Sequence, residues 1–129
     1  MSTKTVGDIM NPKLLYIRDG DRVALARRQI LEFGVTAVPI LDETHRPVGI
    51  ISLRDLERDG DVAEARGDVT MVKASEPIEA AATKLAGTDF HHLVVVDDKG
   101  IAVGMVSAVD FVRALLGLPV RHPKAFDRV

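Results

Sequence analysis

Short runs of mostly apolar residues, without a clean alternation of apolar and polar positions, are spread along the chain and predict strands covered on both faces of a sheet. Six such runs occur, at residues 14–17, 38–41, 48–51, 69–72, 93–96 and 102–106. After the first and the fourth run, apolar residues instead recur three or four positions apart, which predicts amphipathic helices. These residues are Val23, Ala26, Ile30 and Phe33 in one helix and Ile78, Ala81, Ala82 and Leu85 in the other. The order strand, helix, strand, strand therefore occurs twice.

Helix starts are predicted where a hydroxyl side chain precedes an apolar pattern. Thr5, with Asp8 three residues later, has the form of a capping box and opens a short helix over residues 6–10. The other expected starts are Ser52, with a helix to about residue 57; Ser75, with Pro77 in the first turn; and Ser107, with a helix to about residue 116 that Gly117 ends. Each half of the chain therefore predicts the order β-α-β-β-α.

The two halves are copies of one unit at a constant offset. The segment Gly49-Ile50-Ile51-Ser52-Leu53-Arg54-Asp55 closes an apolar run in the first copy, and Gly104-Met105-Val106-Ser107-Ala108-Val109-Asp110 does so in the second, which gives 104 − 49 = 55. The offset holds without a gap from Leu14/Val69 to Leu56/Phe111. An internal repeat fixes the architecture and shows where paired sites lie.

One such unit buries little surface alone, so we expect the two copies to pack as a pseudo-twofold pair. The predicted fold is α/β (α+β), one integrated module of two β-α-β-β-α units. Residues 1–60 form the first repeat with the N-terminal helix, 61–117 the second repeat, and 118–129 a C-terminal tail. The tail shows no periodicity and is expected to be loose or bound to a partner, and His122 within it is given no role.

Composition narrows the function classes. Hydrophobic residues make up 47% of the 129 residues and aromatic residues 4%, which predicts a packed aliphatic core. The net charge of −2 argues against a general nucleic-acid binder, which needs a clustered positive surface. The chain has no cysteine, which excludes disulfides, thiolate zinc sites and cysteine nucleophiles. With no apolar run long enough for a membrane span, the expectation is a cytoplasmic protein.

The repeated Ser-x-x-Asp has a structural and a functional interpretation. As a capping box, the serine hydroxyl accepts a backbone N–H and the aspartate reaches back to the N–H of the cap residue. As a site, the helix N-terminus attracts a phosphate, the serine adds a contact, and the aspartate has acceptor oxygens suited to a ribose diol. Phosphate, diol and apolar strand together describe a nucleotide. The pairs concerned are Ser52 with Asp55 and Ser107 with Asp110.

Two adjacent histidines, His91 and His92, stand just before the middle strand of the second repeat. They are either partly exposed residues of a strand start or donors to a phosphate. Metal binding is disfavoured because neighbouring strand residues point to opposite faces.

The ordered set of motifs closely resembles a tandem pair of CBS domains, the Bateman module, over roughly residues 6–117. The segments that carry the resemblance are Asp8-Ile9-Met10-Asn11-Pro12, Ala37-Val38-Pro39-Ile40-Leu41-Asp42, His92-Leu93-Val94-Val95-Val96-Asp97 and the two Gly-x-x-Ser-x-x-Asp ends. The family implies an adenosine-ligand sensor and dimerisation of modules into a flat disc.

The resemblance also implies two ligand sites. In the better formed one, Asp110 would hold the ribose, Ser107 and His91 the phosphate, and Met10, Leu15, Thr36 and Ala37 would frame the base. The symmetric site would use Asp55 and Ser52, with Thr70, His91 and His92 near the base and Arg54 supplying charge.

We therefore expect a regulatory module without catalysis that binds AMP, ADP, ATP or S-adenosylmethionine between its repeats. It needs no cofactor or metal, forms a homodimer and signals to a regulated protein by conformational or dimer change. The alternative is a ligand-free dimerisation or protein-interaction module in which both Ser-x-x-Asp boxes only cap helices. A weaker third interpretation, nucleic-acid contact by the tail, rests on Arg121, Lys124 and Arg128 alone.

Overall fold

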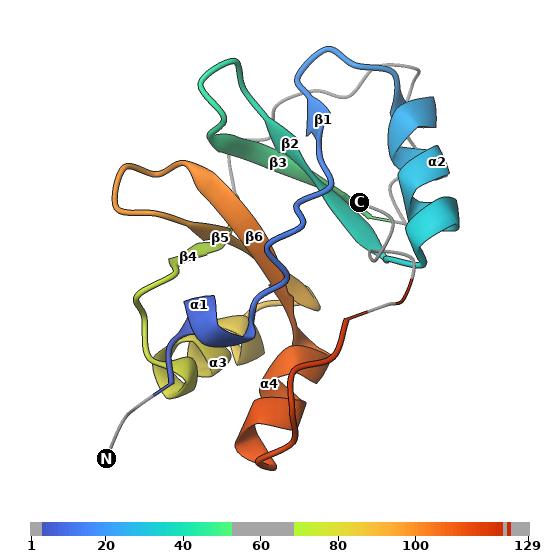
Figure 1. Cartoon of the computed structure of the whole chain (residues 1–129). Coiled ribbons are helices and arrows are strands. Elements are labelled where there is room, and N and C mark those ends of the chain that lie inside the picture. The colour runs from blue at the N-terminus through green and yellow to red at the C-terminus, as the bar shows by residue number, and fades with distance from the viewer. Residues whose placement is uncertain (1–3, 53–68, 123, 125–129) are drawn as a thin grey trace. The chain divides into compact units, whose positions relative to one another are not determined.

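The computed structural model describes residues 4–52, 69–122 and 124 (Figure 1). These residues form two compact units. The first-repeat unit contains the described residues from 15 to 69 and Lys124, and the second-repeat unit contains those up to 14 together with 70–122. Each repeat thus has its own sheet, and the N-terminal helix belongs with the second repeat.

The first-repeat unit is a three-stranded sheet with one helix. Its elements are β1 (Ile17–Arg18), α2 (Val23–Phe33), β2 (Ala37–Leu41) and β3 (Pro47–Ser52). The central strand β2 pairs in parallel with β1 and antiparallel with β3. The apolar stripe of α2 is buried with residues of the sheet, and Gly34 ends the helix in the left-handed region at φ 66°.

The second-repeat unit has the same sheet and two further helices. Its elements are α1 (Val6–Ile9), β4 (Met71–Lys73), α3 (Ile78–Ala86), β5 (His92–Val96), β6 (Ala102–Ser107) and α4 (Ala108–Leu115). Strand β5 pairs in parallel with β4 and antiparallel with β6. Its core contains Val6 and Ile9 of α1, Phe111 of α4, and the buried apolar residues of α3 and of the sheet.

The offset of 55 residues is preserved in the strand register. Ile40 lies opposite Gly49 in the first repeat, and Val95 lies opposite Gly104 in the second. The register shifts directly after Ile40 and directly after Val95, so both hairpins carry the irregularity at the same place. The predicted duplication is therefore confirmed at the level of individual residue pairs.

The N-terminal segment is bound to the second repeat by backbone hydrogen bonds. The N–H of Gly7 donates to the carbonyl of Ala74 at 2.8 Å, and Asn11 and Met105 exchange two bonds of 2.8 and 3.1 Å. An added Cβ on Gly104 would lie 2.7 Å from the carbonyl oxygen of Asn11 and 2.8 Å from the sulfur of Met10. The glycine before the second Ser-x-x-Asp therefore makes room for neighbouring backbone.

Three local predictions were wrong. The strand expected at residues 14–17 starts only at Ile17, because the N–H of Leu14 turns back to the carbonyl of Pro12 at 3.0 Å. The run at 69–72 forms strand only from Met71. Ser75 does not cap α3, because Pro77 takes the extended N-cap position (ψ 146°) and the helix begins at Ile78.

The helix expected after Ser52 lies outside the described residues. In the described part of the chain, no helix has the length and apolar character needed to cross a bilayer.

Candidate functional site

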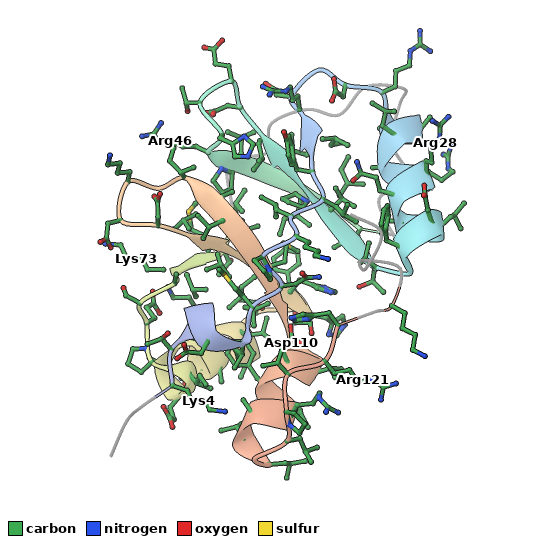
Figure 2. The ribbon with its side chains drawn as sticks, in the orientation of Figure 1. Lys4, Arg28, Arg46, Lys73, Asp110 and Arg121 are labelled. Atoms are coloured by element: carbon green, nitrogen blue, oxygen red, sulfur yellow. The ribbon has the colours of Figure 1, made fainter. Side chains whose placement is uncertain are left out.

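The start of α4 is a complete capping box. The backbone N–H of Ser107 donates to Oδ2 of Asp110 at 2.8 Å, and the N–H of Asp110 donates to Oγ of Ser107 at 3.2 Å. These bonds satisfy backbone donors that a helix N-terminus leaves unpaired. They engage Oδ2 of Asp110 and leave Oδ1 for other partners. Figure 2 shows Asp110 in the first turn of α4, with Arg121 on the chain that follows this helix.

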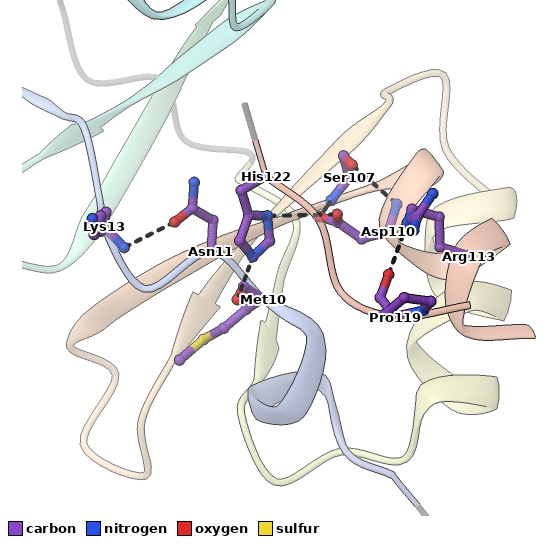
Figure 3. Close-up of polar contacts among 8 residues, drawn as sticks. All are labelled: Met10, Asn11, Lys13, Ser107, Asp110, Arg113, Pro119 and His122. Carbon is purple, nitrogen blue, oxygen red and sulfur yellow. Dashed lines mark hydrogen bonds and ion pairs between the residues drawn. The ribbon is translucent and has the colours of Figure 1, made fainter. Parts of the chain in front are cut away.

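Two histidines share the environment of Asp110. Burial lowers the pKa of His92 below its usual value of 6.5, the Asp110 charge raises it in part, and His91 lowers it further. His122 approaches from the C-terminal side, with Nδ1 3.8 Å from Oδ1 of Asp110 and Nε2 3.2 Å from the carbonyl oxygen of Met10 (Figure 3). The Asp110 side chain is 11% exposed and that of His122 20%. The carboxylate is therefore shielded from most of the solvent and has two imidazoles in its surroundings.

A very small hollow adjoins Asp110. Its volume is about 10 Å³, and it is lined by Ile9, Asp110, Arg113, Ala114, Leu118, Val120 and Arg121. A second, open hollow of about 470 Å³ lies where α3, α4 and the loop before β5 meet, and it is lined by Ala82, Leu85, Ala86, Thr88, Asp89, Phe90, His91, Ala108 and Phe111.

Comparison with known proteins decides the family. The family model described as "CBS domain" matches residues 6–58 and again residues 60–117. The chain belongs to the CBS domain family. It contains a tandem CBS pair, as the sequence predicted, and the two similar sheets are its two CBS folds.

Solved CBS structures resemble the chain over most of its length. The chain is 30% identical to CBSX2 in complex with AMP, covering 88% of this chain and 97% of that one with a TM-score of 0.79; a further CBSX2 structure is from Arabidopsis thaliana. It is 27% identical to the cytosolic domain of the Mg²⁺ channel MgtE in complex with ATP, covering 86% and 48% with a TM-score of 0.74.

Among curated relatives, the homoserine O-acetyltransferase of Methanococcoides burtonii is 27% identical over 117 residues. The match covers 86% of this chain and 24% of that enzyme, so the chain spans about a quarter of the relative's length. The similarity therefore concerns one part of a longer protein.

The second-repeat unit brings together four of the expected site residues. Ser107, Asp110 and His92 gather at the start of α4, and the carbonyl of Met10 reaches the same place through His122. His91 has an exposed side chain that lines the open hollow, while its carbonyl accepts the N–H of Ala108 at 2.9 Å. Its expected phosphate contact stays a prediction.

The remaining expected site residues do not belong to the group around Asp110. Leu15, Thr36, Ala37 and Ser52 belong to the first-repeat unit, so the structure describes the two parts of each expected site separately. Thr70 lies directly before β4 in the second-repeat unit. Asp55 and Arg54 lie outside the described residues, and their roles stay predictions.

Sequence reasoning missed His122. The tail was expected to be loose or partner-bound, yet residues 118–122 contact α4 and the N-terminal segment. The available signal was Gly117, whose φ of 73° follows from its place after a helix end and turns the chain back along α4.

Proposed function

We propose that this CBS pair is a regulatory module that binds an adenosine-containing ligand, AMP, ADP, ATP or S-adenosylmethionine, at the Asp110 end of α4. Ligand binding changes the conformation or the self-association of the module, and a partner protein responds to that change. The proposed role is binding and signalling, and it assigns no catalytic step to the residues that the structure describes.

The observation that carries this proposal is that the two oxygen atoms of the Asp110 carboxylate have different contacts. Oδ2 completes the helix cap, while Oδ1 takes no part in the cap and lies 3.8 Å from Nδ1 of His122, so a hydroxyl donor that displaces this ring can reach it. A ribose diol offers such donors, and the backbone dipole of α4 favours a phosphate near the same helix end. The capping and the ligand-binding interpretations of Ser-x-x-Asp are therefore compatible.

Related structures supply the adenosine part of the proposal. CBSX2 was solved with AMP, and the cytosolic domain of MgtE with ATP. The two ligands share the adenosine moiety and differ in phosphate number. We therefore propose adenosine as the common element and leave phosphate number to be decided by titration.

Titration of two capping-box variants tests the proposal. The chain contains a second capping box, in which the N–H of Thr5 donates to Oδ2 of Asp8 at 2.8 Å at the start of α1. Asp110→Ala removes the proposed ribose acceptor and costs about 1 kcal/mol of stability as a lost cap. Asp8→Ala removes the same kind of cap at another helix start and leaves the Asp110 carboxylate in place, so it serves as the matched control.

The measurement is calorimetric titration with AMP, ADP, ATP and S-adenosylmethionine, supported by thermal unfolding. A ligand at 100 times its Kd adds about 2.7 kcal/mol to the wild-type stability. We expect binding to the wild type and to Asp8→Ala and none to Asp110→Ala. Equal binding by all three proteins would refute a role for Asp110.

A second candidate function, self-association without ligand, is favoured by the surface of α4. Val109, Val112 and Leu116 recur at helical spacing and are 65%, 54% and 68% exposed. We propose that a second copy of this chain covers this apolar stripe. Sedimentation of the wild type and of Val112→Glu tests it: the wild type should sediment as a dimer and the variant as a monomer.

A further inference from the structure

The chain beyond α4 turns back along the helix instead of leaving it. The N–H of Gly117 donates to the carbonyl of Ala114 at 3.1 Å, and that of Leu118 donates to the carbonyl of Arg113 at 2.8 Å. With Gly117 in the left-handed region, this is a Schellman ending, which fixes the direction of the following residues. We name residues 118–122 the C-terminal strap.

A side chain of α4 holds the strap in place. Nε of Arg113 donates to the carbonyl oxygen of Pro119 at 2.9 Å (Figure 3). Because proline lacks an N–H, its carbonyl is the backbone group that Pro119 can offer. The strap is thus attached at its start by the helix end and at Pro119 by a charged donor.

The far end of the strap reaches the functional carboxylate. His122 lies between two acceptors, Oδ1 of Asp110 at 3.8 Å from Nδ1 and the carbonyl oxygen of Met10 at 3.2 Å from Nε2. Since a carbonyl only accepts, Nε2 is the donor to Met10, and a second proton on Nδ1 gives an ion pair with Asp110. One imidazole therefore links the strap, the N-terminal segment and α4.

One hollow beside Asp110 is closed in part by the strap. The hollow there, which Leu118, Val120 and Arg121 of the strap help to line, has a volume of about 10 Å³. This is about the room needed for one water molecule. A sugar ring does not fit into this space, and its hydroxyls would meet His122 at Oδ1.

We propose that the C-terminal strap is an autoinhibitory element: His122 and the ligand's sugar diol compete for Oδ1 of Asp110, so strap docking and ligand binding exclude one another. The inference rests on the proposed function. By linkage, the ligand releases the strap as strongly as the strap weakens the ligand. The released strap is then the change that a partner protein detects.

The first test measures AMP affinity by calorimetry on the full chain. His122→Ala removes the ring and keeps the rest of the strap. Loss of one partly shielded polar contact of this kind changes affinity by about two- to five-fold, so the variant should bind AMP more tightly by that factor. Lys124→Ala, which removes a charge from a described tail residue beyond the strap, is the matched control and should bind as the wild type does.

The second test follows the His122 ring directly by NMR. Without ligand, its ring signals should differ from those of a free peptide covering residues 118–124. Saturation with AMP should move them to the peptide positions. Ring signals equal to those of the peptide before AMP is added, or unchanged by saturating AMP, would overturn the inference.

The outcomes separate this inference from the proposed function. If AMP binds the wild type and His122→Ala equally, or binds the variant more weakly, competition is refuted and the adenosine site stands. If AMP, ADP, ATP and S-adenosylmethionine all fail to bind either protein, the proposed function fails and the competition fails with it.

Discussion

The hairpins of the two repeats make the same hydrogen bonds around different turn residues. Oδ1 of Asp42 accepts the N–H groups two and four residues ahead at 2.8 and 3.0 Å, and Oδ1 of Asp97 does the same at 2.8 and 3.0 Å. The position with positive φ is His45 (69°) in the first turn and Gly100 (84°) in the second. The aspartate, rather than a glycine, is what both copies share.

The repeats differ more in what packs against them. The sheet of the second repeat is joined by Asn11 beside Gly104, and its last helix carries the C-terminal strap. Both additions come from segments outside the repeated pattern. The duplicated residues thus build the folds, and the unduplicated ends bring further groups to Asp110.

The largest expected loss of stability comes from a side chain added at Gly104 in β6, where the Asn11 backbone lies close. In Gly104→Ala, the new Cβ would lie 2.7 Å from the Asn11 carbonyl, and this contact is with backbone, which cannot turn aside as a side chain can. We expect a loss of about 1–3 kcal/mol in the free energy of unfolding, measured by urea denaturation, together with weaker protection of the Asn11 amide against hydrogen exchange.

Gly87→Ala is the matched control for that variant. A Cβ at Gly87 would lie 3.6 Å from the carbonyl oxygen of Lys84 and 3.8 Å from that of Thr83, which are ordinary contacts. Its stability should stay within about 0.5 kcal/mol of the wild type. Equal stability of the two variants would show that the N-terminal segment is not packed against Gly104.

Substitutions in the two hairpin turns should change the free energy of unfolding less than Gly104→Ala does. Gly100→Ala places a Cβ at a φ of 84°, and we expect a loss of about 1 kcal/mol. His45→Gly relieves the same conformation but gives up the edge contact between the rings of His45 and Tyr16, whose centroids lie 4.7 Å apart. The two effects oppose one another, so we expect a net change within about 0.5 kcal/mol. Thermal unfolding checks both variants, and a clear gain in His45→Gly would mean that the ring contact contributes nothing.

The duplication could be predicted because register follows sequence. Gly49 pairs with Ile40 in the first repeat, and the residues 55 positions later, Gly104 and Val95, pair in the same way in the second. Ser107 caps α4 as expected. Hydrophobic runs were less informative at their ends. The run at 14–17 is apolar throughout, but the chain turns at Leu14 and the strand begins only at Ile17. A hydropathy pattern contains no signal for such a turn.

The candidate site was predictable only where its residues recur. Ser107 and Asp110 were found from the repeated motif, whereas His122 was missed because it lies in a tail without periodicity. The packing of α1 on the second repeat was missed because Val6 and Ile9, which are buried in the core of that repeat, also lie outside the duplicated pattern.

The smallest expected effect concerns a position where the repeats differ in chemistry. His92 pairs with Ser107 in β5 and β6, as Ala37 pairs with Ser52 in the first repeat. Burial lowers the pKa of His92 in the folded protein, with the Asp110 charge opposing the shift in part. Between the ordinary pKa of 6.5 and the lower folded pKa, the unfolded chain binds more protons at this position. Stability therefore falls as the pH is lowered through this window.

His92→Ala gives the second repeat the residue of the first and removes this source of pH dependence. We expect the unfolding free energy of the wild type, taken relative to that of the variant, to fall as the pH is lowered from 7.5 to 5.5. Urea denaturation at several pH values measures that difference. A difference that grows toward low pH would mean that the Asp110 charge outweighs burial and that His92 takes up its proton more readily in the folded protein.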